Sequence, residues 1–573
     1  MIFPSRRLLA LVAICGLNIS LTNAQEAILE GERFHPELGT SGMVATSHFL
    51  ASQVAHDTLA QGGNAVDAAV TAGFALAVTQ PRSGNIGGGG FMLISDENTG
   101  EVVAIDYREE APSAAYETMF QDENGEAVAE LSRYTHNASG VPGTVAGLAM
   151  ALEQYGTLSL SEALAPAIEL AKEGFVLPPR FVEGIRDIRN RLEPWEASRK
   201  KFFKEDGSLY QAGETFKQPD LAATLQRIAD QGPREFYEGE TADLIVAEME
   251  KHGGMMTAED LASYQPIIRE PSHGSYRGHE IYAMSPPSSG GAHIVQMLNI
   301  LEGYDINEMG FNSAATIHVM AEAMKRAYAD RSEYLGDTDF ISVPLDGITS
   351  EGYADELRGQ IDMDKATPSE TIAPGNPLPY ESNETTHFSI ADSNGLAVSN
   401  TYTINFSYGS GIVVEGAGFL LNNEMDDFSA KPGVPNAYGL IGGEANKIEP
   451  GKRMLSSMTP TIVKKDGKNY LVTGSPGGSR IITTTLQVLM NVIDHKMNIQ
   501  TAVSVPRIHH QWLPDEIRVE QGISPDTIEL LEEKGHKVSQ QEAMGAAQSL
   551  LIDEGMYFGG ADPRRSTSSA MGL

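Results

Sequence analysis

The character of the chain changes abruptly at Thr385. The residues before it, 366–384, are rich in Pro, Gly, Ser and Thr and show no hydrophobic periodicity, which indicates a loop. Residues 140–330 have mostly helical spacing, and a long helical pattern covers 314–334. The residues after Thr385 instead alternate as strands do, first at 386–391 and 396–405. Helices and antiparallel hairpins around this break favour an α+β fold in layers, or an αββα body.

The first two strands after the break predict a hairpin. If Asn394-Gly395 is a two-residue turn, Thr385 lies opposite Ile404. Thr403 and Asn405 would then flank it on the neighbouring strand, close enough to orient its hydroxyl and amine. A register shifted by one or two residues is also compatible with the pattern.

Thr385 stands where a nucleophile could be released. A Thr hydroxyl reacts poorly unless a base lies beside it, and one such base is the residue's own α-amine once the preceding peptide bond is cut. A loop that ends on Thr at the start of a strand therefore suggests a self-cleaving N-terminal-nucleophile hydrolase. The alternative is an ordinary structural threonine, because Thr is common in strands.

The charge of the chain limits its partners. Its 573 residues carry 41 basic and 77 acidic side chains, which gives a net charge of −36. Such a chain repels nucleic acid and anionic membrane surfaces, so neither is expected as a partner. The acidity is spread along the sequence, and we interpret it as a solubilising surface.

The N-terminus has the features of an export signal. An Arg6-Arg7 pair precedes an apolar stretch at 8–21, and 22–24 (Thr-Asn-Ala) offers small residues for cleavage. The apolar stretch is too short to serve as a membrane anchor. We therefore expect 1–24 to be a signal peptide and the product to be periplasmic or secreted. The single cysteine, Cys15, lies within it, so no disulfide is expected afterwards.

Small residues are concentrated near the start of the mature chain. A strand is predicted at 43–46 and helices at 48–60 and 64–77, with Asn64 as the N-cap of the second helix. The glycine-rich run at 84–94 leads into a strand. It is therefore not a dinucleotide-binding fingerprint, in which glycines join a strand to a helix. We interpret it as a place of close backbone packing.

Three polar clusters follow the hairpin. They are 422–428 after an apolar run, 453–458 before a strand, and 474–480 before a helical pattern. The last contains Gly477 and Gly478, whose backbone N–H groups suit an oxyanion or a carboxylate. Each cluster alone also fits a loop or a helix cap, but their occurrence together after one candidate nucleophile favours a catalytic site.

These residues resemble the gamma-glutamyltranspeptidases, the bacterial periplasmic members in particular. The resemblance covers essentially all of the mature chain, and several of the matching runs are long enough to be specific. The runs are GGNAVDAAV (62–70), GNIGGGGFML (84–93), DYREEAP (106–112), ESNETTHFS (381–389), LLNNEMDDFSAKPGVPN (420–436), LSSMTPTIV (455–463) and GSPGGSRIITT (474–484).

The resemblance implies a four-layer αββα sandwich of the N-terminal-nucleophile hydrolase type. It also implies a precursor that cuts itself between Glu384 and Thr385 into a large subunit, 25–384, and a small subunit, 385–573, which form a heterodimer. Thr385 would then attack the γ-carbonyl of a glutamyl substrate, with its freed α-amine as general base.

Five residues match the anion-binding groups of the family. Arg108, Ser456 and Ser457 correspond to the groups that bind the α-carboxylate of the γ-glutamyl moiety, where a guanidinium fork suits a planar anion. Gly477 and Gly478 correspond to the pair whose backbone N–H groups stabilise the tetrahedral oxyanion.

Four further residues match positions around the ammonium group and the nucleophile. Asn405, Glu424 and Asp427 correspond to those near the α-ammonium and the glutamyl backbone, and Thr403 to the hydroxyl that supports the nucleophile. Some bacterial members carry Gln at the position of Glu424, and animal members carry Glu. Because either can bind an ammonium group, activity is expected with altered affinity.

Two features narrow the expected substrate. Asp427 stands where the related cephalosporin acylases tend to differ, which disfavours a glutaryl-type donor. Residues 431–443 match the lid loop of the family, with Tyr438 as the gate, and a lid favours small donors such as glutathione over polyglutamate. The expected activity is glutathione hydrolysis and γ-glutamyl transfer, without a cofactor.

Other functions fit parts of the pattern. A β-lactam acylase or a polyglutamate hydrolase would share the fold, and a non-catalytic exported binding protein would never mature. A metal enzyme is not expected, because His509-His510 and the other histidines lack ligand spacing such as His-Glu-x-x-His.

Overall fold

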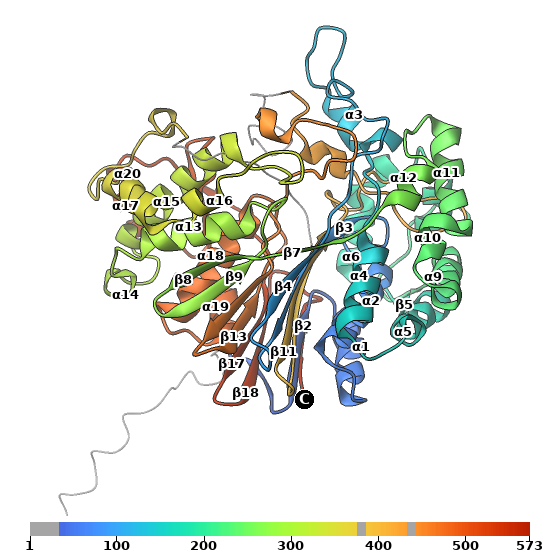
Figure 1. Ribbon diagram of the computed structural model, residues 1–573, viewed down its shortest axis with the longest axis horizontal. Coiled ribbons are helices and arrows are strands. Elements are labelled where there is room, and N and C mark those ends of the chain that lie inside the picture. The colour runs from blue at the N-terminus through green and yellow to red at the C-terminus, as the bar shows by residue number, and fades with distance from the viewer. Residues whose placement is uncertain (1–33, 375–385, 432–442) are drawn as a thin grey trace, which may run out of the picture. The chain divides into compact units, whose positions relative to one another are not determined.

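Two seven-stranded antiparallel β-sheets lie face to face in the fold (Figure 1). A computed structural model describes residues 34–374, 386–431 and 443–573, and Pro36–Leu573 form one compact unit. Sheet A has the strand order β1 (Glu37–Gly39), β18 (Met556–Ala561), β17 (Gln548–Asp553), β13 (Lys468–Thr473), β12 (Thr461–Lys465), β9 (His279–Ala283) and β8 (Ser272–Tyr276). Sheet B has the order β19 (Ser569–Gly572), β2 (Gly42–Thr46), β10 (Thr386–Asp392), β11 (Leu396–Thr403), β3 (Gly89–Asp96), β4 (Val102–Tyr107) and β7 (Ile267–Arg269).

The sheets pack through side chains from alternate strand positions. On β3, Phe91 and Leu93 belong to the core between the sheets, together with Ile462 of β12. Met92 and Ile94 of the same strand belong to the core beneath the outer helices. Because successive residues of a strand face opposite sides, a strand covered on both faces is apolar at every position.

Helices cover the outer face of each sheet and complete four layers. The helices α1 (Phe49–Ala60), α2 (Ala65–Thr79) and α4 (Thr144–Tyr155) share a core with sheet B. The helices α13 (Gly290–Leu301), α15 (Ala314–Tyr334), α18 (Arg480–Ile493) and α19 (Ile499–Ser504) share a core with sheet A. This order confirms the predicted four-layer αββα sandwich.

The remaining elements connect and extend these layers. Between α4 and β7 the chain forms α5 (Leu160–Glu173), β5 (Phe175–Val176), α6 (Pro179–Asp187), α7 (Arg189–Leu192), α8 (Glu196–Phe202), β6 (Thr215–Phe216), α9 (Pro219–Gln231), α10 (Arg234–Glu238), α11 (Glu240–His252) and α12 (Ala258–Ser263). Elsewhere it forms α3 (Ala129–Arg133), α14 (Ile306–Met309), α16 (Leu345–Ile348), α17 (Glu351–Gly359), β14 (Ile508–His509), β15 (Ile517–Glu520), α20 (Pro525–Glu533), β16 (Val538–Gln541) and the 3₁₀ turns η2 (His136–Ala138), η3 (Ser369–Thr371), η4 (Glu424–Asp427) and η5 (Glu444–Asn446).

Most of the predicted elements occur within a residue or two of their expected bounds. The helix α15 spans the predicted 314–334. The helix α2 begins after Asn64, whose side chain accepts from the N–H groups of Val66 and Asp67 in a capping box, as its predicted role as N-cap requires. These elements depend on residues close together in the chain, which is why sequence patterns locate them.

The hairpin of β10 and β11 differs from its predicted register by one residue. Ala391 pairs with Ala397, so the turn contains three residues, 393–395, and the prediction of a two-residue turn was wrong. The Asp392 side chain accepts a hydrogen bond from the N–H of Leu396 at 3.3 Å across this turn. Such a bond from an Asp to the backbone stabilises the longer connection.

Both sheets combine strands from before and after position 385. In sheet B, β10 and β11 lie between β2 and β3, and in sheet A, the block of β12, β13, β17 and β18 lies between β9 and β1. Two fragments produced by a cut next to position 385 would therefore share both sheets and their common core.

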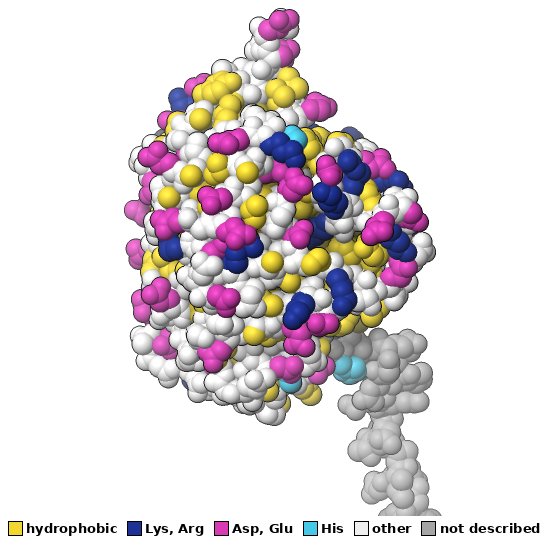
Figure 2. Space-filling view, turned by 90° about the vertical axis from the view of Figure 1, so that its right-hand side faces the viewer, with side chains coloured by type: hydrophobic (Ala, Val, Ile, Leu, Met, Phe, Trp, Pro, Cys, Tyr) yellow, Lys and Arg dark blue, Asp and Glu magenta, His cyan; other side chains and the backbone are white. Residues whose placement is uncertain are grey.

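Charged side chains are distributed over the surface. Figure 2 shows Asp and Glu spread across the face it views, with Lys and Arg among them. Within the described ranges, none of the helices is long and apolar enough to cross a membrane. The predicted signal peptide, 1–24, lies outside these ranges.

Candidate active site

Three of the predicted site residues lie outside the described residues. They are Glu384 and Thr385 at the predicted cleavage point and Tyr438 of the predicted lid. The others come from the end of β11, from η4, from the segments after β4 and β13, and from the loop before β12.

Arg108 lies at the centre of a buried ionic cluster. It follows β4, is fully buried, and donates from Nη1 to Glu424 and from Nη2 to Asp427. Its Nε donates to the carbonyl oxygen of Met454 at 3.1 Å, and Nη2 donates to that of Leu455 at 3.4 Å. These four acceptors hold the guanidinium plane in one orientation, as the recognition of a planar anion requires.

A third carboxyl group adjoins this cluster. Glu109 Oε2 is 3.5 Å from Arg108 Nη1, and no described residue donates a hydrogen bond to either oxygen of Glu109. Burial raises the pKa of Glu109 to about 8, although the charge of Arg108 opposes the shift. Burial, together with the charge of Glu109, also raises the pKa of Glu424. Three carboxyl groups thus surround one guanidinium, and burial disfavours the ionised forms of Glu109 and Glu424.

Asn422 anchors the segment that carries two of these carboxyl groups. Its Nδ2 donates to the carbonyl oxygens of Gly87 at 2.9 Å and Gly140 at 2.8 Å. Its Oδ1 accepts from the N–H groups of Gly140 at 2.9 Å and Glu424 at 3.0 Å. Because the whole amide is engaged, it fixes the start of η4 and with it the position of Glu424.

Thr403 ends β11, and Asn405 follows it in an unusual conformation. Asn405 has φ +66°, and its N–H donates to Thr403 Oγ1 at 2.8 Å. Its Nδ2 donates to the carbonyl oxygen of Asn423 at 2.9 Å, which joins β11 to the segment before η4. The side chain of Asn405 is buried, yet no described residue donates to its Oδ1, so this oxygen is available to an ammonium group.

The glycine-rich run packs against the end of β11. A Cβ at Gly88 would lie 2.0 Å from the carbonyl oxygen of Thr403, so only glycine fits there. Asn85 Nδ2 donates to the same carbonyl at 2.8 Å, and Asn85 Oδ1 accepts from the N–H of Gly88 at 2.9 Å. The interpretation of this run as a place of close backbone packing is confirmed.

Ser456 and Ser457 follow the two carbonyl groups that bind Arg108, and a second arginine reaches them. Arg331, on α15, donates from Nη2 to Ser457 Oγ, and its Nε donates to Ser289 Oγ at 2.9 Å. Arg331 is buried and was not among the predicted site residues. An arginine in a helical pattern is normally expected at the surface, so no signal in the sequence marked it.

The turn between β13 and α18 offers two backbone N–H groups. Gly477 has φ +135° and Gly478 has φ +64°. No described residue accepts a hydrogen bond from either N–H. A φ of +135° is open to glycine alone, so the backbone here is specialised for this conformation. Two such N–H groups can stabilise a developing oxyanion.

Helix α15 connects the serine segment with the glycine turn. The hydroxyl group of Tyr328 donates to the carbonyl oxygen of Ser479, which directly follows the two glycines. Tyr328 and Arg331 are three residues apart and share a helix face, with the guanidinium carbon 5.7 Å from the Tyr328 ring centroid. One helix therefore positions both Ser457 and the Gly477–Gly478 turn.

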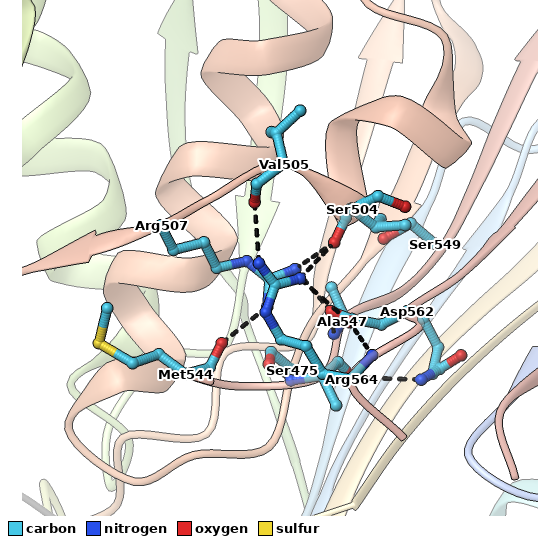
Figure 3. Close-up of polar contacts among 12 residues, drawn as sticks. Ser475, Ser504, Val505, Arg507, Met544, Ala547, Ser549, Asp562 and Arg564 are labelled. Carbon is cyan, nitrogen blue, oxygen red and sulfur yellow. Dashed lines mark hydrogen bonds and ion pairs between the residues drawn. The ribbon is translucent and has the colours of Figure 1, made fainter. Parts of the chain in front are cut away.

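A buried ion pair supports the glycine turn from the other side. Arg507 donates to Asp562 Oδ2 at 2.6 Å and to the carbonyl oxygen of Met544 at 2.7 Å (Figure 3). Gly545, the residue after Met544, packs against the turn, since a Cβ at Gly477 would lie 3.2 Å from Gly545 Cα. This pair was not predicted, because its partners are 55 residues apart in the chain.

Comparison with known proteins identifies the family. The profile of the gamma-glutamyltranspeptidase family matches residues 51–572. The chain belongs to the gamma-glutamyltranspeptidase family. Over 537 residues it is 53% identical to the glutathione hydrolase proenzyme of Escherichia coli (strain K12), an alignment that covers 94% of this chain and 92% of that protein.

Solved structures of related proteins share the fold of this gamma-glutamyltranspeptidase family member. The cephalosporin acylase of Bacillus halodurans aligns with a TM-score of 0.84 and 30% identity, over 94% of this chain and 97% of that one. The gamma-glutamyltranspeptidase of Helicobacter pylori aligns with a TM-score of 0.57 and 49% identity, over 58% of this chain and 94% of that one. The fold is accordingly of the N-terminal-nucleophile hydrolase type.

Proposed function

We propose that this protein is a self-processing γ-glutamyl hydrolase and transferase whose nucleophile is Thr385. The observation that carries the proposal is the buried guanidinium of Arg108 between Glu424 and Asp427. One cation and several carboxyl groups in a closed site complement the α-carboxylate and α-ammonium of an amino acid. A γ-glutamyl group retains both of these charges.

Processing exposes the nucleophile. The Thr385 hydroxyl oxygen attacks the carbonyl carbon of Glu384, the peptide C–N bond breaks as its nitrogen takes up a proton, and an ester forms. Water then hydrolyses the ester, which leaves a carboxylate on Glu384 and a free α-amine and hydroxyl on Thr385. The products are the subunits 25–384 and 385–573, and the strand order of the two sheets supports their staying together.

The described part of the hairpin supports Thr403 as a neighbour of Thr385. The ladder begins with Thr386 opposite Tyr402, and its continuation by one residue would pair position 385 with Thr403 instead of Ile404, with Asn405 two residues further along the chain. Burial lowers the pKa of His387, on the same strand, to about 3, so this histidine is a poor general base. An α-amine normally titrates at about 8 and is better suited to accept the hydroxyl proton.

Transfer then proceeds through an ester. The α-amine takes the hydroxyl proton as Thr385 Oγ1 attacks the γ-carbonyl carbon, and the N–H groups of Gly477 and Gly478 stabilise the oxyanion. The γ-glutamyl C–N bond breaks, and the amine departs with the proton. Water resolves the ester to glutamate, whereas an acceptor amine resolves it to a new γ-glutamyl amide.

The zwitterionic end of the donor is bound by the ionic cluster. Its α-carboxylate lies against Arg108, and its α-ammonium lies against Glu424, Asp427 and the Asn405 Oδ1 atom. The ammonium pairs with carboxyl groups of the cluster, while the α-carboxylate pairs with the guanidinium. Because 431–443 resembles the lid of the family, the donor is a small γ-glutamyl compound such as glutathione.

Export completes the proposal. Residues 1–24 serve as a signal peptide, and the mature enzyme acts in the periplasm or outside the cell. The one cysteine of the precursor, Cys15, would be removed with the signal peptide. A mature chain without cysteine is consistent with this location.

Intact mass together with N-terminal sequencing of the purified protein tests the processing. A small subunit that begins at Thr385 is expected, and a single uncut band with donor binding would favour the non-catalytic alternative. Hydrolysis of glutathione, a glutaryl-cephalosporin and polyglutamate should be compared in parallel, because the likeness to a cephalosporin acylase makes that donor the relevant rival. A preference for either rival donor would overturn the substrate assignment.

A further inference from the structure

Two imidazoles and one carboxylate converge away from the candidate active site. His136 lies in η2, and Glu248 and His252 lie one turn apart at the C-terminal end of α11. Glu248 Oε1 is 3.0 Å from His136 Nε2 and 3.4 Å from His252 Nε2. The two imidazole rings lie 4.6 Å apart, centroid to centroid, with an interplanar angle of 16°. Both rings thus direct the same nitrogen at one carboxylate oxygen.

The spacing of these atoms suits a transition-metal ion. The three ligand atoms all lie within 4.8 Å of one another. An ion with bonds of about 2.1 Å and tetrahedral geometry places its ligand atoms about 3.4 Å apart. The Glu248–His252 distance of 3.4 Å equals that value and the Glu248–His136 distance of 3.0 Å is somewhat shorter, so a modest adjustment of the side chains would place the three atoms around an ion.

The surroundings of the cluster favour metal binding. Trp195 packs edge-on against both rings, with centroid distances of 5.0 Å to His136 and 5.4 Å to His252, and so restricts their rotation. The side chains of His136 and Glu248 are buried, while that of His252 is 31% exposed and leaves a path for an ion and for water. The arrangement is that of three protein ligands with one open position.

A second His–Glu–His group in the described chain lacks these properties. In the group of His318, Glu322 and His536, the carboxylate of Glu322 is already bound by Lys325 at 3.1 Å and Arg326 at 2.7 Å. The two imidazoles hydrogen-bond each other directly, at 2.7 Å. A metal ion there would be repelled by the two buried cations, Lys325 and Arg326. We therefore interpret this group as part of the hydrogen-bonded protein core.

We propose that His136, Glu248 and His252 bind one divalent transition-metal ion of the Zn²⁺ class, with water as the fourth ligand. The ion would tie the end of α11 to η2. After η2, Ser139 donates to the carbonyl oxygen of Asn422 at 2.7 Å, and Asn422 anchors η4. Through these contacts the ion would brace the segment that carries Glu424 and Asp427 without touching the substrate.

Metal binding to the mature enzyme tests the proposal. The enzyme is prepared without a histidine tag, stripped with a chelator, and titrated with ZnCl₂ by calorimetry. One Zn²⁺ per chain is expected. His252→Gln and Glu248→Gln should each weaken binding by about 10-fold or more, since each removes one of three ligands. The control His273→Gln changes a histidine whose side chain is 51% exposed on β8 and should leave the affinity unchanged.

Two further measurements keep the outcome decisive. Bound Co²⁺ should give visible absorption bands typical of tetrahedral coordination in the wild type but not in His252→Gln. Zn²⁺ should raise the Tm of the wild type and of His273→Gln but not that of His252→Gln. His252 is the last residue of α11 and its side chain is partly exposed, and circular dichroism checks that its variant is folded. Failure to bind Zn²⁺ at one per chain, or equal affinity in the wild type and both ligand variants, would overturn the proposal.

Discussion

Arg108 and Asp427, 319 residues apart in the chain, form an ion pair that is sealed from solvent. Because a buried charge is costly unless it is paired, this contact commits the end of β4 and the segment η4 to one arrangement. The presence of Glu424 and Glu109 beside the pair leaves the cluster with more carboxyl groups than cations. A zwitterionic substrate brings an ammonium group to these carboxyl groups and a carboxylate to the guanidinium, so the same charges that hold the site together can bind an amino acid.

Replacement of Thr385 by alanine should prevent maturation. Without the hydroxyl group there is neither an attack on Glu384 nor a later ester, so we expect one uncut chain and activity at background level. Denaturing electrophoresis and intact mass measure the first effect, and glutamate release measures the second. Thr385→Ser is the matched control, because it keeps a hydroxyl and should still cleave, though more slowly. Two subunits in the alanine variant would rule out Thr385 as the nucleophile.

Arg108→Lys should impair donor binding more than chemistry. Lysine keeps the charge but lacks the planar fork that reaches Glu424, Asp427 and the substrate carboxylate together. The loss of charged hydrogen bonds, worth about 1.5–3 kcal/mol, corresponds to a KM increase of about 10–100-fold with a smaller change in kcat. Arg189→Lys, in a solvent-exposed pair with Glu193, is the control and should leave KM unchanged. An unaltered KM for Arg108→Lys would contradict the proposed carboxylate site.

Gly477→Ala should lower kcat by about 10²–10³-fold, the usual loss when an oxyanion donor is misplaced. At φ +135° an alanine forces the backbone to move, and the two N–H groups move with it. The control is Gly467→Ala in the β12–β13 turn, where φ is also positive, at +77°, and no atom approaches the added Cβ. The control should lose about 1 kcal/mol of stability and keep its kcat. A normal kcat in Gly477→Ala would exclude this turn as the oxyanion site.

Asp562→Asn should destabilise the protein by about 3 kcal/mol, because it leaves the buried charge of Arg507 without its partner. The two oxygens of Asp562 accept hydrogen bonds from Arg507, from the N–H of Ala547 and from Arg564. In the variant, the NH₂ group of the asparagine side chain therefore faces another donor in either orientation of the amide. The segment behind Gly477 should loosen as a result, and kcat should fall as well. Thermal unfolding and steady-state kinetics measure both effects. Asp553→Asn, an exposed change at the end of β17, should alter neither.

Glu109→Gln should change how stability depends on pH. The raised pKa of Glu109, about 8, means that the folded protein binds a proton which the unfolded chain releases near 4.5. This group therefore makes its full contribution below about pH 4.5, and the contribution falls as the pH rises toward 8, by up to roughly 1.4 kcal/mol per pH unit. The variant lacks this loss, so its Tm relative to wild type should increase from pH 5 to pH 8. A constant difference would show that Glu109 is ionised in the native state.

Sequence patterns predicted the long helices because these helices are determined by residues close together in the chain. The spacing at 314–334 and the cap at Asn64 predicted α15 and α2 from residues within a few positions of each other. The β10–β11 hairpin was predicted, but its turn was one residue too short. That detail depends on the Asp392 side chain, which bonds across the turn and makes the longer connection stable.

Most residues of the candidate site were predicted from the resemblance to a family. The structure shows which of these residues are in contact. Arg108, Glu424 and Asp427 are in direct contact. The serines and the glycine turn are instead linked through Arg331 and Tyr328 of α15. Neither α15 residue had a recognisable pattern, because a polar side chain on a buried helix face looks like a surface residue until the packing is known.

The amino-acid sequence by itself determined the helices and strands, the acidic character of the chain and the position of the loop that ends at Thr385. These follow from periodicity, capping and composition, which act over a few residues. The tertiary structure decided the four-layer stacking, the hairpin register, the closed charge cluster around Arg108 and the convergence of His136 with Glu248, 112 residues away. Such contacts arise because the buried sheets bring distant segments together, and burial makes each unpaired charge or polar group costly enough to select a single arrangement.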